Sequence, residues 1–153
     1  RRVETTEEMA GVVGELLRST DVLIMAAAPA DFRPTTVATT KIEKGKKAPI
    51  IAMKQTTDIL GSTLGKRRKG AIVVGFALET EDAVRRGIKK LRDKALDLIV
   101  VNDATEAGAG FGVDTNRVTL IDRAGKQDAL PLMSKAAVAD VILDRVEQIA
   151  RER

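Results

Sequence analysis

The sequence predicts a single α/β domain of 153 residues, with a three-layer, Rossmann-like fold built on a mostly parallel sheet that helices cover on both faces. Short apolar runs without polar alternation recur along the chain, which is typical of parallel strands that are buried on both faces. Segments with helical spacing of apolar residues separate these runs. We expect a β-hairpin flap and an antiparallel edge to complete the fold.

The chain is expected to open with a helix and a buried strand. Thr5 and Glu8 have the spacing of a capping box, and apolar residues follow them at helical intervals. Residues 21–28 form an apolar run after a single charge, which predicts a strand that is buried on both faces. A loop punctuated by prolines then leads away from this strand.

A hairpin, a helix and a second strand are expected next. Residues 40–54 predict the hairpin, with strands at 41–42 and 49–53 around a basic turn. Residues 57–68 predict a helix that ends in a cluster of cations and a glycine. Residues 71–78 are apolar throughout and predict a second fully buried strand.

The remaining sequence first continues the alternation of helices and strands and then predicts antiparallel strands. Thr80 is expected to cap a helix, and residues 96–101 to form the third buried strand. Residues 117–121 alternate like an antiparallel edge strand, and a turn leads to a short return strand near residue 129. Ser134 is expected to cap the final helix, whose apolar residues follow a helical period.

Composition excludes several classes of chemistry. The chain has no Cys and no His, which rules out a disulfide framework, a thiolate nucleophile, an imidazole base and the usual zinc sites. Its formal net charge is +4 but only 2% of its residues are aromatic, so phosphorylated small molecules explain the basic surplus better than nucleic acid does. No apolar run approaches the roughly 20 residues that span a bilayer, and we expect a soluble cytoplasmic protein.

Ligands bind such sheets outside the carboxyl ends of the parallel strands, which here are AAAPADFRP, GFALET and VVND. The first of these ends, the hairpin beyond it and the following helix start carry candidate residues. Asp31 is suited to Mg²⁺ or a ribose hydroxyl, or else forms a turn with Arg33 as a surface partner. Lys41 is suited to neutralise a carboxylate or phosphate during transfer, although a solvated strand lysine is the commoner outcome. Thr57 and Asp58 begin a helix whose free N–H groups suit phosphate, or simply cap it.

The helix expected after residue 80 carries a stripe of cations. Arg86, Lys90 and Lys94 are four residues apart and share one helical face, which suits a phosphate and a solvated surface equally. Asn102 and Asp103 close the third strand, where a turn is slightly favoured over a functional role.

Two glycine-rich strings resemble nucleotide-binding motifs without meeting their requirements. Residues 61–66, GSTLGK, are one residue too short for a phosphate loop and lie inside a predicted helix. Residues 108–112, GAGFG, do not open a helix, as a dinucleotide-binding fingerprint must. A Rossmann-type oxidoreductase is therefore disfavoured.

Several strings, in register, resemble the ligase domain of the bacterial bifunctional phosphopantothenoylcysteine synthetase/decarboxylase. The opening VETTEEM also resembles this family, so the resemblance covers essentially the whole chain. The strings are MAAAPADFRP (25–34), KIEKG (41–45), TDIL (57–60), VVGFALET (73–80), KKLRDKALDLIVVND (89–103) and FGVDTNRVTLI (111–121).

The resemblance implies a phosphopantothenate–cysteine ligase of coenzyme A biosynthesis. The carboxylate of 4′-phosphopantothenate attacks the α-phosphorus of CTP, giving an acyl-cytidylate and pyrophosphate, and the amine of L-cysteine then displaces CMP. This chemistry needs no protein nucleophile, so catalysis reduces to positioning and charge neutralisation, with Mg²⁺ on the phosphates and no metal site of the protein's own.

The resemblance also implies roles for individual residues. Lys41 is the catalytic residue, serving the active site from the flap, Lys90 and Lys94 hold the triphosphate, and Phe76 flanks the base or ribose. The remaining implied nucleotide contacts are Met25, Ala26, Ala27, Ala30, Asp31, Phe32, Thr57, Asp58, Ile59 and Leu60.

Nothing in residues 1–153 matches the family's N-terminal ligase segment, which holds much of the phosphopantothenate site. We therefore expect this chain alone to have little or no ligase activity, with the missing segment and, in bifunctional members, a fused decarboxylase domain as partners. Family members associate through this region, which implies a homodimer with the hairpin as an interface element. The alternative function is a non-catalytic nucleotide-binding or dimerisation module.

Overall fold

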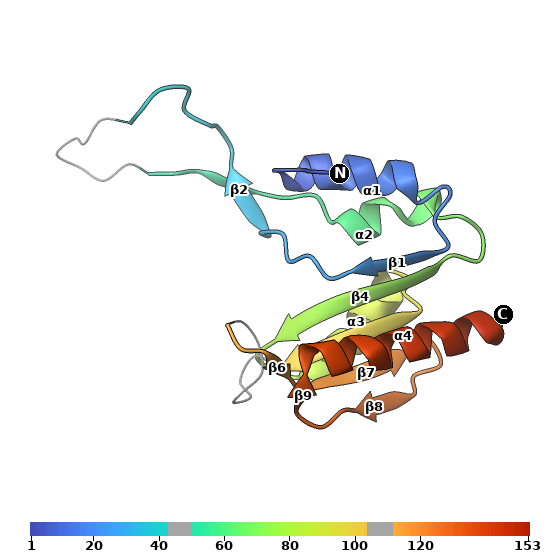
Figure 1. Ribbon diagram of the computed structural model, residues 1–153. Helices are drawn as coiled ribbons and strands as arrows, with labels where there is room; N and C mark the ends of the chain where they lie inside the picture. Colours follow the sequence, from blue (N-terminus) through green and yellow to red (C-terminus); the bar gives the residue numbers. More distant parts are fainter. Residues whose placement is uncertain (43–49, 104–111) are drawn as a thin grey trace.

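The computed structural model describes residues 1–42, 50–103 and 112–153, which form one α/β body with a projecting arm (Figure 1). None of the helices in this part of the chain is long and apolar enough to cross a membrane. In chain order the elements are α1 (Thr6–Leu16), β1 (Val22–Met25), β2 (Phe32–Pro34), β3 (Met53–Gln55), α2 (Ile59–Ser62), the 3₁₀ helix η1 (Leu64–Lys66), β4 (Ile72–Glu79), α3 (Ala83–Asp93), β5 (Leu98–Asp103), β6 (Thr115–Asn116), β7 (Val118–Asp122), β8 (Gln127–Ala129), β9 (Met133–Ser134) and α4 (Lys135–Arg151).

The central sheet has the strand order β1-β4-β5-β7-β8 and is mixed, so the prediction of a mostly parallel sheet with an antiparallel edge is confirmed only in part. β1, β4 and β5 are parallel neighbours, whereas β7 pairs antiparallel with β5 and β8 pairs antiparallel with β7. β7 and β8 are joined by a short turn, as antiparallel neighbours can be, whereas parallel neighbours need a longer crossover. As a result β7 lies inside the sheet, and β8 rather than β7 forms that edge.

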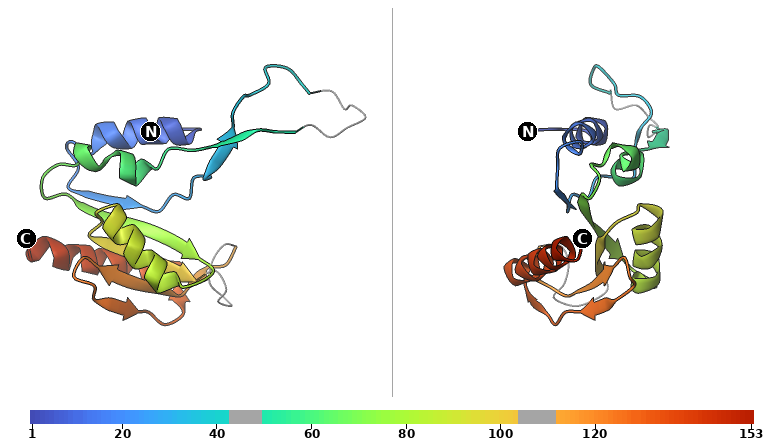
Figure 2. Two further views of the ribbon diagram at one scale, coloured as in Figure 1. Left: turned by 180° about the vertical axis from the view of Figure 1, so that it is seen from behind. Right: turned by 90° about the vertical axis from the view of Figure 1, so that its right-hand side faces the viewer.

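Helices α3 and α4 cover opposite faces of this sheet, as the three-layer prediction requires (Figure 2). On one face α4 buries Val138, Ile142 and Val146 against β4, β5 and β7. On the other face Leu91 of α3 packs with Leu60 of α2 against the alternate residues of the same strands. Burying each such aliphatic side chain contributes about 1.5–3 kcal/mol, so both helices are held chiefly by their apolar faces.

Strand β1 is not buried on both faces, contrary to the sequence prediction. It is the edge strand beyond β4, and Val22 and Ile24 remain 39% and 38% exposed. Phe76 and Leu78, which β4 directs to the same face, are exposed to a similar degree. The apolar run predicted a strand correctly, but it could not reveal that α4 leaves this part of the sheet uncovered.

The helix predicted at residues 57–68 is much shorter than expected. α2 ends after four residues and η1 follows it, so the segment tightens into 3₁₀ geometry instead of continuing as an α-helix. Gly61 and Gly65 lower the helix propensity of this stretch, which explains the early end. Asp58, and not Thr57, is the N-cap, and its carboxylate accepts a hydrogen bond from the N–H of Gly61 at 3.2 Å.

Of the three other predicted helix N-caps, two are confirmed and one is wrong. Thr5 accepts a hydrogen bond from the N–H of Glu8, and Ser134 caps α4 through the N–H three residues later. Thr80 does not cap α3. That helix begins later, after Asp82 adopts a left-handed backbone with φ 47°, which redirects the chain from the end of β4 into the helix.

The predicted hairpin exists, but its paired strands lie elsewhere. β2 and β3 pair antiparallel, with Phe32 opposite Gln55 and Pro34 opposite Met53. Residues 41–42 belong to no strand, and the predicted turn at 43–47 lies outside the described residues. Residues 35–42 and 50–52, which follow β2 and precede β3, form an arm that extends away from the body (Figure 1). The arm carries Lys41.

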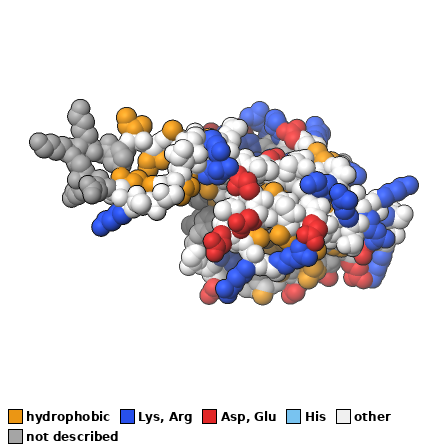
Figure 3. Space-filling model, turned by 90° about the horizontal axis from the view of Figure 1, so that it is seen from above, with side chains coloured by type: hydrophobic (Ala, Val, Ile, Leu, Met, Phe, Trp, Pro, Cys, Tyr) orange, Lys and Arg blue, Asp and Glu red, His pale blue; other side chains and the backbone are white. Residues whose placement is uncertain are grey.

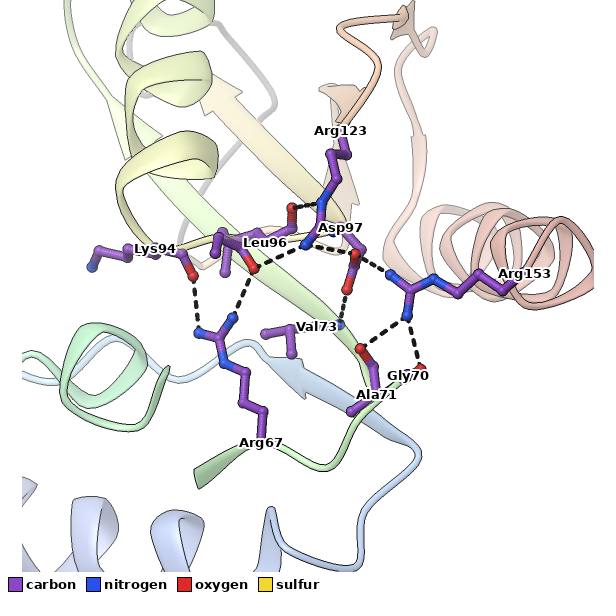
Figure 4. Close-up of polar contacts among 10 residues, drawn as sticks. Arg67, Gly70, Ala71, Val73, Lys94, Leu96, Asp97, Arg123 and Arg153 are labelled. Atoms are coloured by element: carbon purple, nitrogen blue, oxygen red, sulfur yellow. Dashed lines mark hydrogen bonds and ion pairs between the residues drawn. The ribbon is translucent and has the colours of Figure 1, made fainter. Parts of the chain in front are cut away.

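A buried carboxylate organises the end of the sheet opposite the carboxyl ends of the parallel strands. Asp97, directly before β5, is 3% exposed and accepts a hydrogen bond from the N–H of Val73 at 2.8 Å (Figure 4). Arg123 lies 3.0 Å from the same carboxylate, and Arg153 makes a second close ion pair with it. Arg67 donates to three backbone carbonyls nearby, and burial lowers the pKa of its guanidinium, with repulsion from Arg123 adding to the effect.

Candidate functional site

The candidate site is a cavity of about 890 Å³ at the carboxyl ends of the parallel strands. β1 ends at Met25, opposite Gly75, whereas β4 continues to Glu79. Beyond Gly75 the edge of β4 therefore has no strand beside it on the β1 side. The chain leaves the sheet at this point into the loop that follows β1, which opens the crevice that parallel sheets use for ligands.

Most of the residues that the resemblance selected meet in this cavity. Ala30 and Lys41 do not line it: Ala30 lies in the loop behind Asp31, and Lys41 lies on the arm. Their roles, like those of the lining residues, remain predictions. The predicted residues that line the cavity are Met25, Ala26, Ala27, Asp31, Phe32, Thr57, Asp58, Ile59, Leu60, Phe76, Lys90 and Lys94.

Hydrogen bonds from Thr56 hold the loop after β1 that forms one wall of the cavity. The hydroxyl of Thr56 donates to the carbonyl of Ala30 at 2.5 Å, and the N–H of Thr56 donates to the carbonyl of Asp31 at 2.9 Å. Arg33 forms an ion pair with Glu7 of α1 at 2.8 Å, so it does not act as the surface partner of Asp31. Within the described residues the Asp31 carboxylate has no hydrogen bond or ion pair, which leaves it available to a ligand.

A second wall carries two lysines with acidic partners, Lys90 of α3 and Lys94, which directly follows this helix. Lys94 lies 2.9 Å from Asp58, the N-cap of α2. Partial burial acts to raise the pKa of the Asp58 carboxyl, but hydrogen bonds from Lys94 and from the N–H of Gly61 outweigh it and hold this pKa below its ordinary value. Lys90 lies 2.6 Å from Glu79 at the end of β4. Both lysines therefore lie at the cavity wall, each in an ion pair with a carboxylate.

Sequence reasoning missed the wall that α4 and its neighbours supply. Residues Asn102 and Asp103 belong to β5, so the preference for a turn there is wrong. The buried Oδ1 of Asn102 has no hydrogen-bond partner among the residues that the structure describes. The apolar spacing of α4 predicted core residues, and no local signal indicated that the first turns of this helix also face a cavity. The residues on this side of the cavity are Leu78, Asn102, Asn116, Lys135, Val138, Ala139 and Ile142.

A second groove, of about 810 Å³, runs along the outer side of α3 and is chemically different. Two of its three cations are paired with neighbouring acids: Arg85 with Asp82 at 2.9 Å, and Lys89 with Asp93. Such exposed pairs contribute little and are typical of a solvated helical face. The cavity at the strand ends is the better binding site, because it is lined by two lysines and by a carboxylate that has no partner in the described part of the chain.

The cavity suits a ligand that combines a polyanionic part with a flat, partly apolar part. Lys90 and Lys94 provide two positive charges on one side, and Phe76, which is 39% exposed, provides an aromatic surface on the other. Among the residues that the structure describes, no three acidic side chains converge to hold a metal ion.

Comparison with known families and proteins gives consistent matches. The family model for the DNA/pantothenate metabolism flavoprotein C-terminal domain matches residues 1–150. The coenzyme A biosynthesis bifunctional protein CoaBC of Bacillus subtilis (strain 168) is 41% identical over 150 residues, which cover 98% of this chain and 37% of that protein. A cysteine/cysteine sulfinic acid decarboxylase from an unknown prokaryotic organism is 41% identical over 145 residues, which cover 94% of this chain and 40% of that protein. The chain thus spans about two fifths of the length of these relatives.

Solved structures agree with the fold. The crystal structure of the C-terminal domain of CoaBC matches with a TM-score of 0.79 and 31% identity, covering 100% of this chain and 66% of that one. A Cab2 mutant in complex with phosphopantothenate-cysteine matches with a TM-score of 0.69 and 16% identity, covering 98% of this chain and 53% of that one. At that identity the second likeness shows the fold alone.

Proposed function

The chain belongs to the family of DNA/pantothenate metabolism flavoprotein C-terminal domains, and on this basis we propose that it is the nucleotide-binding part of a CTP-dependent phosphopantothenate–cysteine ligase. The observation that carries the proposal is the cavity at the strand ends, which Lys90 and Lys94 line together with Asp31, a carboxylate that has no partner among the described residues. A nucleoside triphosphate has the charge, the flat base and the ribose hydroxyls that these walls suit. The relatives named for coenzyme A biosynthesis supply the reaction class.

The proposed reaction needs positioning more than protein chemistry. A carboxylate oxygen of 4′-phosphopantothenate attacks the α-phosphorus of CTP, the bond to the β-phosphate oxygen breaks, and pyrophosphate leaves. The amine of L-cysteine then attacks the acyl carbon, loses a proton and releases CMP. Lys90 and Lys94 neutralise the triphosphate charge in the first step, and Phe76 packs against the base or ribose. Lys41, on the arm, keeps its proposed role in neutralising charge during transfer.

Magnesium accompanies the nucleotide in this scheme. Mg²⁺ typically binds through one or two carboxylates together with substrate phosphates, and it retains several waters. Asp31 fits the carboxylate role because its side chain lines the cavity and has no partner within the described residues. When bound, the ion would offset negative charge on the phosphates undergoing transfer.

Calorimetric titration with CTP and with ATP, each with Mg²⁺, tests the proposal directly. We expect the chain to bind CTP in preference to ATP. Lys90→Ala removes a charge-assisted contact to phosphate and should weaken CTP binding about tenfold. Asp31→Ala should weaken it as well, because the ribose or metal contact is lost.

Lys89→Ala is the matched control for this titration. Lys89 precedes Lys90 on α3 but pairs with Asp93 on the outer side of the helix, so its removal should leave the Kd within about twofold. A folded chain that binds neither nucleotide, or that loses as much affinity with Lys89→Ala as with Lys90→Ala, would contradict the proposed site.

The alternative from a different class is a module that binds nucleotide or dimerises without catalysis. The matched relatives are more than twice as long as this chain, and their decarboxylase activities are not assigned to it. Pyrophosphate release distinguishes the two functions. A catalytic part supplied with both substrates and the family's N-terminal ligase segment releases pyrophosphate from CTP, whereas a binding module does not.

We further propose that two copies of the chain associate through the arm. Figure 3 shows hydrophobic side chains gathered on the arm, where Val37, Ile50 and Ile51 are 83%, 99% and 58% exposed. Such a concentration of exposed apolar residues marks an interaction surface, and a second copy can bury it symmetrically. Ile50→Lys with Ile51→Lys should shift the chain from dimer to monomer in light scattering. Leu143→Lys, at an exposed apolar residue of α4, should leave the mass unchanged, and a parent chain that is monomeric would contradict the proposal.

A further inference from the structure

The last residue of β4 carries a buried carboxylate on the face that α3 covers. Glu79 is 6% exposed, and its register neighbour on β5 is Asp103, so two acidic residues lie side by side at the end of the sheet. Lys90 lies 2.6 Å from Glu79 Oε1, and Arg86 lies 3.7 Å from Oε2. Arg86 also lies 3.7 Å from Glu81, so its charge is shared between two acids.

In the cluster of Glu79, Lys90 and Arg86, only the carboxylate is buried. The carboxylate is the buried member, whereas the side chains of Lys90 and Arg86 are 44% and 51% exposed. Removing a carboxylate from water is costly, and replacing a buried ion pair by apolar residues is often neutral or stabilising. Val73 and Ala77, the inward residues of β4 on this same face, are indeed apolar. Packing alone therefore gives no reason for an acid at position 79.

Lys90, in contrast to Arg86, reaches the candidate site. Its ammonium has three N–H donors. The contact of its Nζ with Glu79 Oε1 is an ion pair, without the angles of a hydrogen bond, because that oxygen has no hydrogen-bond partner among the described residues. The lysine lines the cavity, which Arg86 does not. A free lysine on a helix surface samples many rotamers, and fixing it when a ligand binds costs side-chain entropy. A carboxylate that already holds the ammonium at the wall removes much of that cost.

We propose that Glu79 is a positioning residue for the nucleotide, holding the Lys90 ammonium at the cavity wall where it meets the triphosphate. This inference rests on the proposed function. A carboxylate also repels the negatively charged triphosphate. For Glu79 to favour nucleotide binding, the gain in binding free energy from fixing Lys90 must exceed this repulsion. Removing the charge of Glu79 therefore weakens nucleotide binding, and it does so only through Lys90.

A double-mutant cycle with Mg·CTP as the probe tests the inference. Kd is measured by calorimetry for the parent chain, Glu79→Gln, Lys90→Ala and the double variant. Freeing one rotamer-rich side chain should weaken binding about threefold to tenfold in Glu79→Gln. In the Lys90→Ala background the Glu79→Gln change should have no further effect, because the group through which it acts is gone. A merely structural role for Glu79 would lower the melting temperature without this dependence on Lys90.

Each of the other possible results contradicts either the positioning role of Glu79 or the proposed function. Unchanged or tighter binding by Glu79→Gln, or effects of the two changes that add, overturns the positioning role while the proposed function stands. No binding by the parent chain overturns the proposed function, and the inference with it. Should Glu79→Gln fail to fold, Glu79→Asp decides instead: it keeps the charge but draws the ammonium back from the wall, so a Kd equal to that of the parent overturns the inference.

Discussion

Replacing Asp97 by alanine should lower the free energy of unfolding by about 3 kcal/mol, one of the two largest effects expected for a single substitution in this chain. The carboxylate is 3% exposed and joins the N–H of Val73 to Arg123 and Arg153 (Figure 4). Alanine leaves that buried N–H without an acceptor and leaves two guanidinium groups facing each other without a counter-ion. Urea unfolding followed by circular dichroism measures the loss, which corresponds to roughly 10 °C in Tm for a chain of this size.

Asp93→Ala is the matched control for this substitution. Asp93 also forms an ion pair, with Lys89, but both side chains are exposed on the outer face of α3. Exposed pairs of this kind contribute about 0.3–0.5 kcal/mol, so the control should differ little from the parent chain. If Asp97→Ala also costs less than 1 kcal/mol, the buried cluster does not hold this end of the sheet together, and apolar packing alone does.

The contrast between these two aspartates explains which parts of the fold could be predicted. Apolar runs located β4 and β5, because burial on both faces leaves a mark in the sequence that needs no knowledge of the neighbours. The role of Asp97 depends on Arg123 and Arg153, which are 26 and 56 residues away along the chain and carry no local signal. The exposed face of β1 was likewise invisible, because an apolar run does not record which helix covers it.

The walls of the candidate site were likewise predicted only in part. The walls formed by the loop after β1 and by α3 were predicted, since strand ends are the ligand side of a parallel sheet and cations four residues apart share a helical face. The wall formed by α4 was not, because Val138 and Ile142 have the spacing of core residues and serve both purposes. Lys41 was placed in a hairpin strand, but the strand pairing lies nearer the body and leaves this lysine on the arm.

The close approach of α3 to the sheet leads to the second large prediction. Gly87 faces β5, and a Cβ atom added there would lie well inside van der Waals contact of Val101 Cγ2. Val101 is β-branched and buried, so its methyl group cannot move aside freely. Gly87→Val should therefore destabilise the chain by about 3 kcal/mol, despite the better helix propensity of valine, because the added atoms overpack the interface. Thermal and urea unfolding measure this loss.

Gly11→Ala and Gly87→Ala together separate helix propensity from packing. A Cβ at Gly11 in α1 meets no atom within 4 Å, so Gly11→Ala should stabilise the chain by about 0.5–1 kcal/mol. The same change at Gly87 should destabilise it, and Val101→Ala in that background should recover part of the loss by making room. Because α3 and the residue that follows it place Lys90 and Lys94 at the cavity, Gly87→Val should also weaken nucleotide binding in the fraction that remains folded. Stabilisation by Gly87→Ala would show that α3 can lift away from β5 at little cost, and the position of both lysines would then not be fixed by this contact.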